Sequence, residues 1–293
     1  MDTFTHDGLR FDVIDGGPDD GAPVVLLHGF PQDASAWSQV SQRLQAAGLR
    51  TLAPHQRGYS SGARPRRATA YRMDLLVGDV VALLDAAGIE RAHVVGHDWG
   101  GGVAWVLAGS RPERVASLTV LSTPHPAALA SALRHSDQLR KSWYMVAFQL
   151  PWLPERGMAR MLRTGGLARS GVPAEHDRRY AERLGRAGDL TGPINWYRAG
   201  MRPRLAGLRP GRKVPAGVAP SPPVTLPTTY LWGSRDPFLG RAAAERTARH
   251  AGEDYRFVEV AAGHWLPERE PELVAQQIIA TVERSAKDGS CYG

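Results

Sequence analysis

Short apolar runs that stop at glycine or proline recur along the chain and predict buried strands. Residues 24–27 and 93–95 are two such runs, and residues 255–260 alternate apolar and polar positions as a strand does. The run at 93–95 leads through a glycine-rich turn into residues 102–108, which are small and helix-competent. Strands that alternate with helices predict an α/β protein with a mostly parallel sheet flanked by helices.

The middle of the chain follows a different pattern. After residue 124 the alternation of strands and helices breaks, and no convincing strand occurs for about a hundred residues. Helical patterns take its place, over residues 137–150, 156–163 and 176–186. We therefore expect one core, formed by residues 1–123 and 227–293, with a helical cap inserted at 124–226.

The last part of this cap has its own composition. Residues 202–227 hold seven prolines and several glycines, which predicts an extended linker that returns the chain from cap to core. The tail after Arg284 is expected to be frayed.

The glycine-rich turn carries the first candidate catalytic residue. Residues 96–101 read GHDWGG, so Asp98 lies at a sharp turn from strand to helix. A serine at such a turn attacks acyl carbons. A carboxylate that displaces an oxygen or halogen from a saturated carbon instead forms an ester, which water can reopen. Asp98 is therefore a candidate nucleophile for such carbons, although Asp is also a good N-cap for the following helix.

A second loop supplies candidate hydrogen-bond donors for this site. The strand at 24–27 runs into the sequence HGFP at 28–31. In α/β folds with a sharp strand-to-helix turn, the loop after this strand directs a backbone N–H at the nucleophile. We expect the N–H groups of Phe30 and Trp99 to form an oxyanion hole. We interpret His28 as shaping the loop rather than as a second base. The Phe30–Pro31 bond is a candidate cis peptide, because cis is cheap only before proline.

Two further candidates lie far downstream, each after a predicted strand. Residues 228–237 read as a strand that ends in a turn with Asp236 at its tip, and the strand at 255–260 delivers His264 to the next loop. Taken singly, Asp236 fits a turn residue and His264 a surface histidine. Together with Asp98 they follow the order nucleophile, acid, histidine of an α/β-hydrolase triad, so we predict that triad.

These motifs point to one family. Over nearly its whole length the chain resembles α/β-hydrolase-fold epoxide hydrolases with an aspartate nucleophile, a branch related to haloalkane dehalogenases. Residues 28–31 and 96–101 match the oxyanion and elbow motifs of that family, and residues 56–60 resemble another of its recurring loops. The family often has Asp where this chain has His55, a departure that concerns loop packing more than chemistry.

The resemblance also assigns residues in the cap. Residues 143–151 and 195–198 are similar to the two family segments that bear catalytic tyrosines, which places those roles on Tyr144 and Tyr197. Spacing alone favours packing for two aromatic residues in cap helices. The expected substrate-binding residues are Phe30, Trp99 and Trp143.

The activity implied by the resemblance is the conversion of a small-molecule epoxide to a vicinal diol through a covalent ester on Asp98. Tyr144 and Tyr197 would hydrogen-bond to the epoxide oxygen and protonate it. Water activated by His264 and Asp236 would then hydrolyse the ester. This chemistry needs no cofactor and no metal, and the sequence contains no Cys/His cluster that suggests one.

Other functions stay open. A haloalkane dehalogenase shares the Asp-Trp elbow, with Trp99 and Trp143 as halide donors, but such enzymes often have Asn where this chain has Phe30. A fluoroacetate-type dehalogenase fits less well, since it has Arg in place of Trp99. From a different class, a non-catalytic ligand-binding protein on the same scaffold would usually lack a triad residue, whereas this chain has candidates for all three.

Composition narrows the class of protein further. A chain of 293 residues, 43% of them hydrophobic, can bury a large core. The net charge of +7 does not indicate nucleic acid, because only three of the 36 basic residues are lysines and the arginines are scattered. The start of the chain does not read as a signal peptide, and no apolar run is long enough to span a membrane. With Cys291 as the one cysteine, we expect a cytoplasmic enzyme, monomeric or homodimeric.

Overall fold

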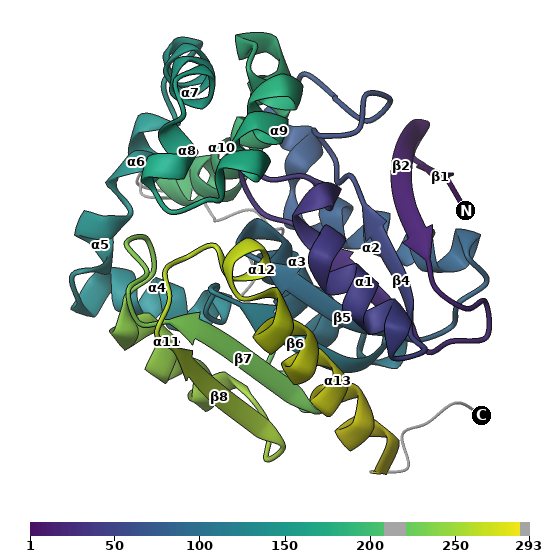
Figure 1. The fold of residues 1–293 in the computed structure, drawn as a ribbon. Helices are drawn as coiled ribbons and strands as arrows, with labels where there is room; N and C mark the ends of the chain where they lie inside the picture. The colour runs from purple at the N-terminus through teal and green to yellow at the C-terminus, as the bar shows by residue number, and fades with distance from the viewer. Residues whose placement is uncertain (208–220, 288–293) are drawn as a thin grey trace.

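An eight-stranded sheet forms the centre of the molecule (Figure 1). The computed structural model describes residues 1–207 and 221–287. In spatial order the strands are β1 (Thr3–His6), β2 (Leu9–Gly16), β4 (Arg50–Pro54), β3 (Pro23–Leu27), β5 (Ala92–His97), β6 (Val115–Leu121), β7 (Thr228–Gly233) and β8 (Tyr255–Val260). From β4 to β8 all neighbours pair in parallel, whereas β1 pairs with β2, and β2 with β4, in antiparallel register.

Both faces of this sheet are buried, which is why its central strands read as continuous apolar runs. Along β3, Val25 and Leu27 belong to one hydrophobic cluster, and Val24 and Leu26 to a second. Side chains of a strand alternate between its two faces, so the two clusters lie on opposite sides of the sheet. The prediction of a mostly parallel sheet flanked by helices is confirmed.

The helices divide into two groups. Those of the core are α1 (Ser38–Ala46), α2 (Met73–Ala86), α3 (Trp99–Ser110), α11 (Arg241–Arg246), α12 (Leu266–Arg269) and α13 (Pro271–Lys287). Residues of α2 and α3 pack on one face of the sheet, and residues of α1 and α13 on the other.

The segment between β6 and β7 is helical in its described residues. It holds α4 (Pro126–His135), α5 (Gln138–Lys141), α6 (Trp143–Ala147), α7 (Leu153–Arg163), α8 (Gly166–Arg169), α9 (Ala174–Leu184) and α10 (Ala187–Gly207). Figure 1 shows α7 to α10 grouped at the top of the molecule, beyond one end of the sheet. Helix α4 packs against α11 of the core, so we use the term cap helices for α5 to α10.

One predicted helical stretch is divided in the structure. The pattern over 137–150 forms two short helices, α5 and α6, which meet at Ser142. Gln138 holds α5 against a core loop, because its side-chain amide donates to the carbonyl O of Phe238 and accepts from the N–H of Gly240, each at 2.8 Å. The patterns at 156–163 and 176–186 correspond to α7 and α9.

The predicted linker starts too early. Helix α10 continues to Gly207, through Pro193 and Pro203, where the sequence predicts an extended chain from residue 202. Packing supports the helix around Pro193, because its neighbours Leu190 and Ile194 are fully buried. Residues 208–220, which carry part of the predicted linker, lie outside the described residues.

The prediction of a frayed tail after Arg284 is also wrong for its first residues. Helix α13 runs on to Lys287, and Ser285 is buried. Residues 288–293, with Cys291, lie outside the described residues.

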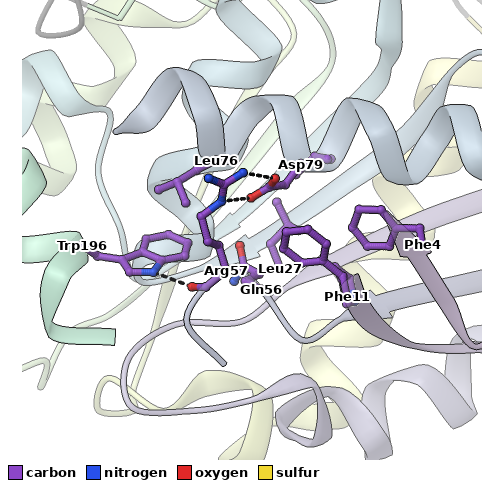
Figure 2. A pocket seen from close by; sticks show the side chains of 10 residues that line it. Phe4, Phe11, Leu27, Gln56, Arg57, Leu76, Asp79 and Trp196 are labelled. Atoms are coloured by element: carbon purple, nitrogen blue, oxygen red, sulfur yellow. Dashed lines mark hydrogen bonds and ion pairs between the residues drawn. The ribbon is translucent and has the colours of Figure 1, made fainter. Parts of the chain in front are cut away.

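A buried polar cluster ties one cap helix to the core (Figure 2). The indole N–H of Trp196, in α10, donates to the carbonyl O of Arg57 at 2.8 Å. The Arg57 guanidinium donates two hydrogen bonds to the Asp79 carboxylate, at 2.8 and 2.6 Å, and both side chains are buried. Removing one partner of a buried ion pair typically costs about 3–5 kcal/mol. The cluster therefore fixes α10 against the sheet, and with it the next residue, Tyr197.

Candidate active site

The turn between β5 and α3 projects Asp98 from the end of the sheet. Its backbone has φ 49° and ψ −120°, a conformation that residues other than glycine rarely adopt. The chain approaches closely on both sides. A Cβ on Gly100 would collide with the carbonyl O of Leu27, and one on Gly29 would collide with Asp98 itself. Asp98 stands at the N-cap position of α3, yet its side chain makes no capping hydrogen bond, so the arrangement does not favour the N-cap alternative.

The Asp98 carboxylate faces the two predicted oxyanion donors. The backbone N–H of Phe30 donates to Oδ2 of Asp98 at 2.9 Å, and the backbone N–H of Trp99 also hydrogen-bonds to this carboxylate. The Phe30–Pro31 peptide is cis, as the sequence predicts. Burial raises the pKa of Asp98, while nearby His264 and the two N–H groups oppose that rise by stabilising the charged form.

Asp236 and His264 meet beside this carboxylate. Asp236 follows β7, and its Oδ1 accepts the backbone N–H groups of Phe238 and Leu239 at 2.7 and 3.0 Å. Its Oδ2 accepts from Nδ1 of His264 at 2.7 Å. The other ring nitrogen of His264, Nε2, lies 3.8 Å from Oδ1 of Asp98. The structure thus brings the three residues of the predicted triad together.

Two opposing effects act on the His264 imidazole, which is buried. Burial alone lowers its pKa, but the charge and hydrogen bond of Asp236, followed by the charge of Asp98, raise the pKa above the ordinary histidine value. The ring is therefore a stronger base than an isolated imidazole, and its proton acceptor, Nε2, is directed at Asp98.

The cap helices place two tyrosines near Asp98 and the residues that flank it. Tyr197 of α10 packs against the rings of Trp99 and Phe30, with centroids 5.0 and 5.3 Å apart. Tyr144 of α6 lies 6.0 Å from Tyr197. Burial, and then the charge of Asp98, raises the pKa of both phenols, so both are protonated at neutral pH and can donate hydrogen bonds.

Comparisons with known proteins identify the family of this chain. A family model described as the alpha/beta hydrolase fold matches residues 22–271. The chain belongs to the α/β-hydrolase family. This hydrolase is 36% identical to AB hydrolase superfamily protein YfhM of Bacillus subtilis, over 93% of this chain and 94% of that protein. It is 33% identical to epoxide hydrolase A of Mycobacterium tuberculosis, over 93% of this chain and 94% of that protein. The resemblance that the motifs indicate is confirmed.

A solved structure shares the fold of this hydrolase. It is described as one of the novel epoxide hydrolases of the α/β-hydrolase superfamily in metagenomes from hot environments, with a TM-score of 0.81 and 29% identity. The match covers 96% of this chain and 97% of that chain.

Trp143 departs from its predicted role. The structure places its side chain on the outer side of α6 with 69% exposure, whereas Tyr144 and Phe148 face the other predicted site residues. Consecutive residues of a helix point in directions about 100° apart, so Trp143 cannot share the inward direction of Tyr144. The structure gives no support to Trp143 as a substrate-binding residue.

Two aromatic residues of the site were missed from the sequence. Phe148 packs against Tyr197 at 4.8 Å, and Phe238 packs against His264 at 5.1 Å and Tyr144 at 5.9 Å. A signal existed for each. Phe148 lies four residues after Tyr144 on the same helical pattern, and Phe238 lies two residues after Asp236 in the same turn.

The remaining histidines of the oxyanion region are structural. His28 is fully buried, its Nε2 accepts the backbone N–H of Gln56 at 3.2 Å, and burial lowers its pKa to about 3. His55 contacts Arg183 of α9, with Nη1 and Nε2 3.3 Å apart. His28 therefore shapes the loop, and His55 packs between core and cap.

Within residues 1–207 and 221–287, no group of three or more His, Cys, Asp or Glu side chains is arranged to hold a metal ion. None of the helices in those ranges is both long and apolar enough to cross a bilayer.

The contact between Asp236 and His264 predicts a measurable change. Asp236→Asn removes the negative charge that raises the pKa of His264, so the pKa of this histidine should fall. NMR titration of the histidine ring signals checks this. Glu245→Gln, at an exposed carboxylate, serves as the control and should leave the His264 titration unchanged. An unchanged pKa in Asp236→Asn would contradict the pairing.

Proposed function

We propose that this hydrolase is an epoxide hydrolase that converts a small-molecule epoxide to a vicinal diol through a covalent ester on Asp98. The observation that carries the proposal is the position of two phenols of the cap helices, the buried Tyr197 and the partly buried Tyr144, beside Trp99 and Phe30, which flank the Asp98 carboxylate of the core. A carboxylate suits attack on a saturated carbon, and the phenols suit an oxygen that leaves as an alkoxide. The epoxide hydrolases among the relatives point the same way.

In the first step, a carboxylate oxygen of Asp98 attacks one carbon of the epoxide. The C–O bond of that carbon breaks, and the ring oxygen takes up the electron pair. Tyr144 and Tyr197 donate hydrogen bonds to this oxygen, and one of them protonates it. General acid help of this kind typically contributes ~10²–10⁴ in rate. Displacement in line requires the nucleophile and the leaving oxygen on opposite sides of the carbon, which the core and cap walls provide.

In the second step, water hydrolyses the ester. His264 takes a proton from water as the water oxygen attacks the carbonyl carbon of the Asp98 ester, and Asp236 stabilises the resulting imidazolium. The backbone N–H groups of Phe30 and Trp99 bind the oxyanion, where one such donor is typically worth about 2.7–4 kcal/mol. As the intermediate collapses, the imidazolium of His264 gives its proton to the ester oxygen that leaves with the diol. The new carboxyl group of Asp98 gives its proton to the tyrosinate formed in the first step, which restores the carboxylate and the phenol, so the cycle needs no cofactor.

A haloalkane dehalogenase is the second candidate, because it uses the same nucleophile. A departing halide needs two N–H donors, and the sequence offers Trp99 and Trp143. The Trp143 side chain is largely exposed, and the ring of Trp99 packs against that of Tyr197, with centroids 5.0 Å apart. These positions favour an epoxide over a haloalkane as the substrate. A non-catalytic role is disfavoured because Asp98, Asp236 and His264 are all present and hydrogen-bonded or in close contact.

Product analysis separates these functions. The purified wild-type enzyme should form diols from epoxides and release no bromide from alkyl bromides with the same carbon skeleton. Asp98→Ala should abolish diol formation, with a loss on the order of 10⁶ by comparison with removal of other enzymes' nucleophiles. Bromide release without diol formation would establish the dehalogenase instead. Turnover by the folded Asp98→Ala variant would contradict the nucleophile.

The ester intermediate should accumulate when its hydrolysis is blocked. His264→Gln removes the base but leaves the nucleophile, so the protein should gain the mass of one substrate molecule on exposure to an epoxide. Intact-protein mass spectrometry detects this adduct. Asp98→Ala combined with His264→Gln is the control and should gain no mass. A folded His264→Gln variant that never forms the adduct counts against the ester.

Replacing the two phenols tests the cap side of the mechanism. Tyr144→Phe and Tyr197→Phe remove only the hydroxyl groups, so packing is kept while acid help is lost. We expect each change to slow single-turnover ester formation, and the double variant to lose about 10²–10⁴ in rate. Tyr255→Phe is a matched control outside the site and should keep the wild-type rate. A double variant as fast as wild type would return both tyrosines to a packing role.

A further inference from the structure

A buried chain of three polar side chains runs beneath the site and takes no part in the proposed reaction. Gln32 follows the oxyanion loop, His97 ends β5, and Glu268 lies in α12, just after His264. Their exposed fractions are 0%, 0% and 5%. Buried polar groups are costly unless their hydrogen bonds are satisfied, so the contacts of this chain constrain its protonation.

The first contact fixes the orientation of the Gln32 amide. The backbone N–H of Gly29 lies 2.8 Å from one end of that amide. A backbone N–H only donates, so this end is the oxygen, Oε1. The other end, Nε2, therefore donates to Oε1 of Glu268, at 2.7 Å. An acceptor at Oε1 of Glu268 thus supports the same amide orientation, in which Oε1 of Gln32 faces Gly29.

His97 lies between two acceptors. Its Nδ1 is 2.7 Å from Oε1 of Gln32, and its Nε2 is 2.9 Å from the carbonyl O of His264. Neither oxygen carries a proton, so each contact is a hydrogen bond only if the ring nitrogen carries one. A neutral imidazole has one N–H and would set a lone pair against an oxygen at the other contact. The imidazolium satisfies both contacts.

Glu268 is the matching anion. Its Oε1 accepts from Gln32 and from the hydroxyl of Tyr180, a residue of cap helix α9, at 2.9 Å. Its Oε2 is buried and has no hydrogen-bond partner among the described residues. Burial and then the charge of His264 lower the pKa of His97, and burial raises that of Glu268, so a charged form of either residue depends on its hydrogen-bond partners. The other titratable side chains near the pair are His28, His264 and Tyr180.

We propose that Glu268 is a positioning residue that orients Gln32 and keeps His97 as an imidazolium, which joins the oxyanion loop to the His264 loop. Gln32 holds the N–H of Gly29, next to the donor Phe30, and His97 holds the backbone O of His264. The catalytic consequence rests on the proposed function, whereas the protonation of His97 does not. Tyr180 extends the same chain to the cap helices.

Histidine-ring ¹⁵N NMR tests the protonation directly. In the wild-type protein near neutral pH, both ring nitrogens of His97 should be protonated, with the signals assigned by their loss in His97→Gln. Glu268→Gln removes the charge at nearly constant volume and should leave His97 with one unprotonated nitrogen. Tyr180→Phe is the matched control, because it removes one hydrogen bond to the same carboxylate but keeps its charge. It should leave His97 doubly protonated.

Single-turnover kinetics measure the effect on chemistry. In Glu268→Gln, hydrolysis of the ester should slow about 10–100-fold, the range known for partners that orient metal-bound histidines, and Tyr180→Phe should lose less. A neutral His97 in the wild type would overturn the proposal whatever the kinetics, and this measurement needs the His97→Gln variant only to assign the signals. Unchanged His97 signals in Glu268→Gln would also overturn it. A failure to form any diol would overturn the proposed function but would not alter the NMR result.

Discussion

The strained backbone at Asp98 is the constraint on which the rest of the site depends. A residue other than glycine held outside the common backbone regions costs of order 1–3 kcal/mol, so the surroundings must hold it. They do so from two sides. The hydroxyl of Thr123 donates to the carbonyl O of Asp98 at 2.7 Å, and the N–H of Gly102 closes the first turn of α3 on the same carbonyl at 3.0 Å. The apolar packing of β5 between two hydrophobic layers supplies the stability that offsets the strain.

The opposite wall of the site is held by charge rather than by the sheet. Arg198, next to Tyr197 in α10, is buried and donates to the carbonyl O of Phe148 at 3.0 Å and to Glu155 of α7 at 2.6 Å. Hydrogen bonds between charged groups are stronger than neutral ones. One guanidinium therefore sets the spacing between the helix that carries Tyr197 and the segment that follows Tyr144. The Arg57–Asp79 pair fixes the same helix to the core, so both phenols are placed by buried arginines.

The sequence predicted the parts of the site that depend on local pattern. Each residue of the predicted triad, Asp98, Asp236 and His264, follows a strand. The parallel sheet brings the ends of those strands to one edge, so the order of the three residues along the chain was sufficient to predict that they lie together. The proposed role of Trp143 finds no support in the structure, because a family motif does not state which side of a short helix faces the site. The predicted start of the linker at residue 202 was wrong because proline content favours an extended chain, whereas the backbone of α10 continues to Gly207. The chain of Gln32, His97 and Glu268 had no local signal, since its contacts join residues up to 236 positions apart.

The electrostatics of the triad change in the course of the proposed cycle. In the free enzyme the charge of Asp98 helps to raise the pKa of His264, which favours a protonated ring. Formation of the ester removes that charge, so the pKa of His264 falls at the stage when a neutral imidazole is needed to accept a proton from water. Asp236 keeps its charge throughout and stabilises the imidazolium once it forms. A carboxylate nucleophile therefore differs from a serine in more than the bond that it makes, because its own neutralisation prepares the base for the second step.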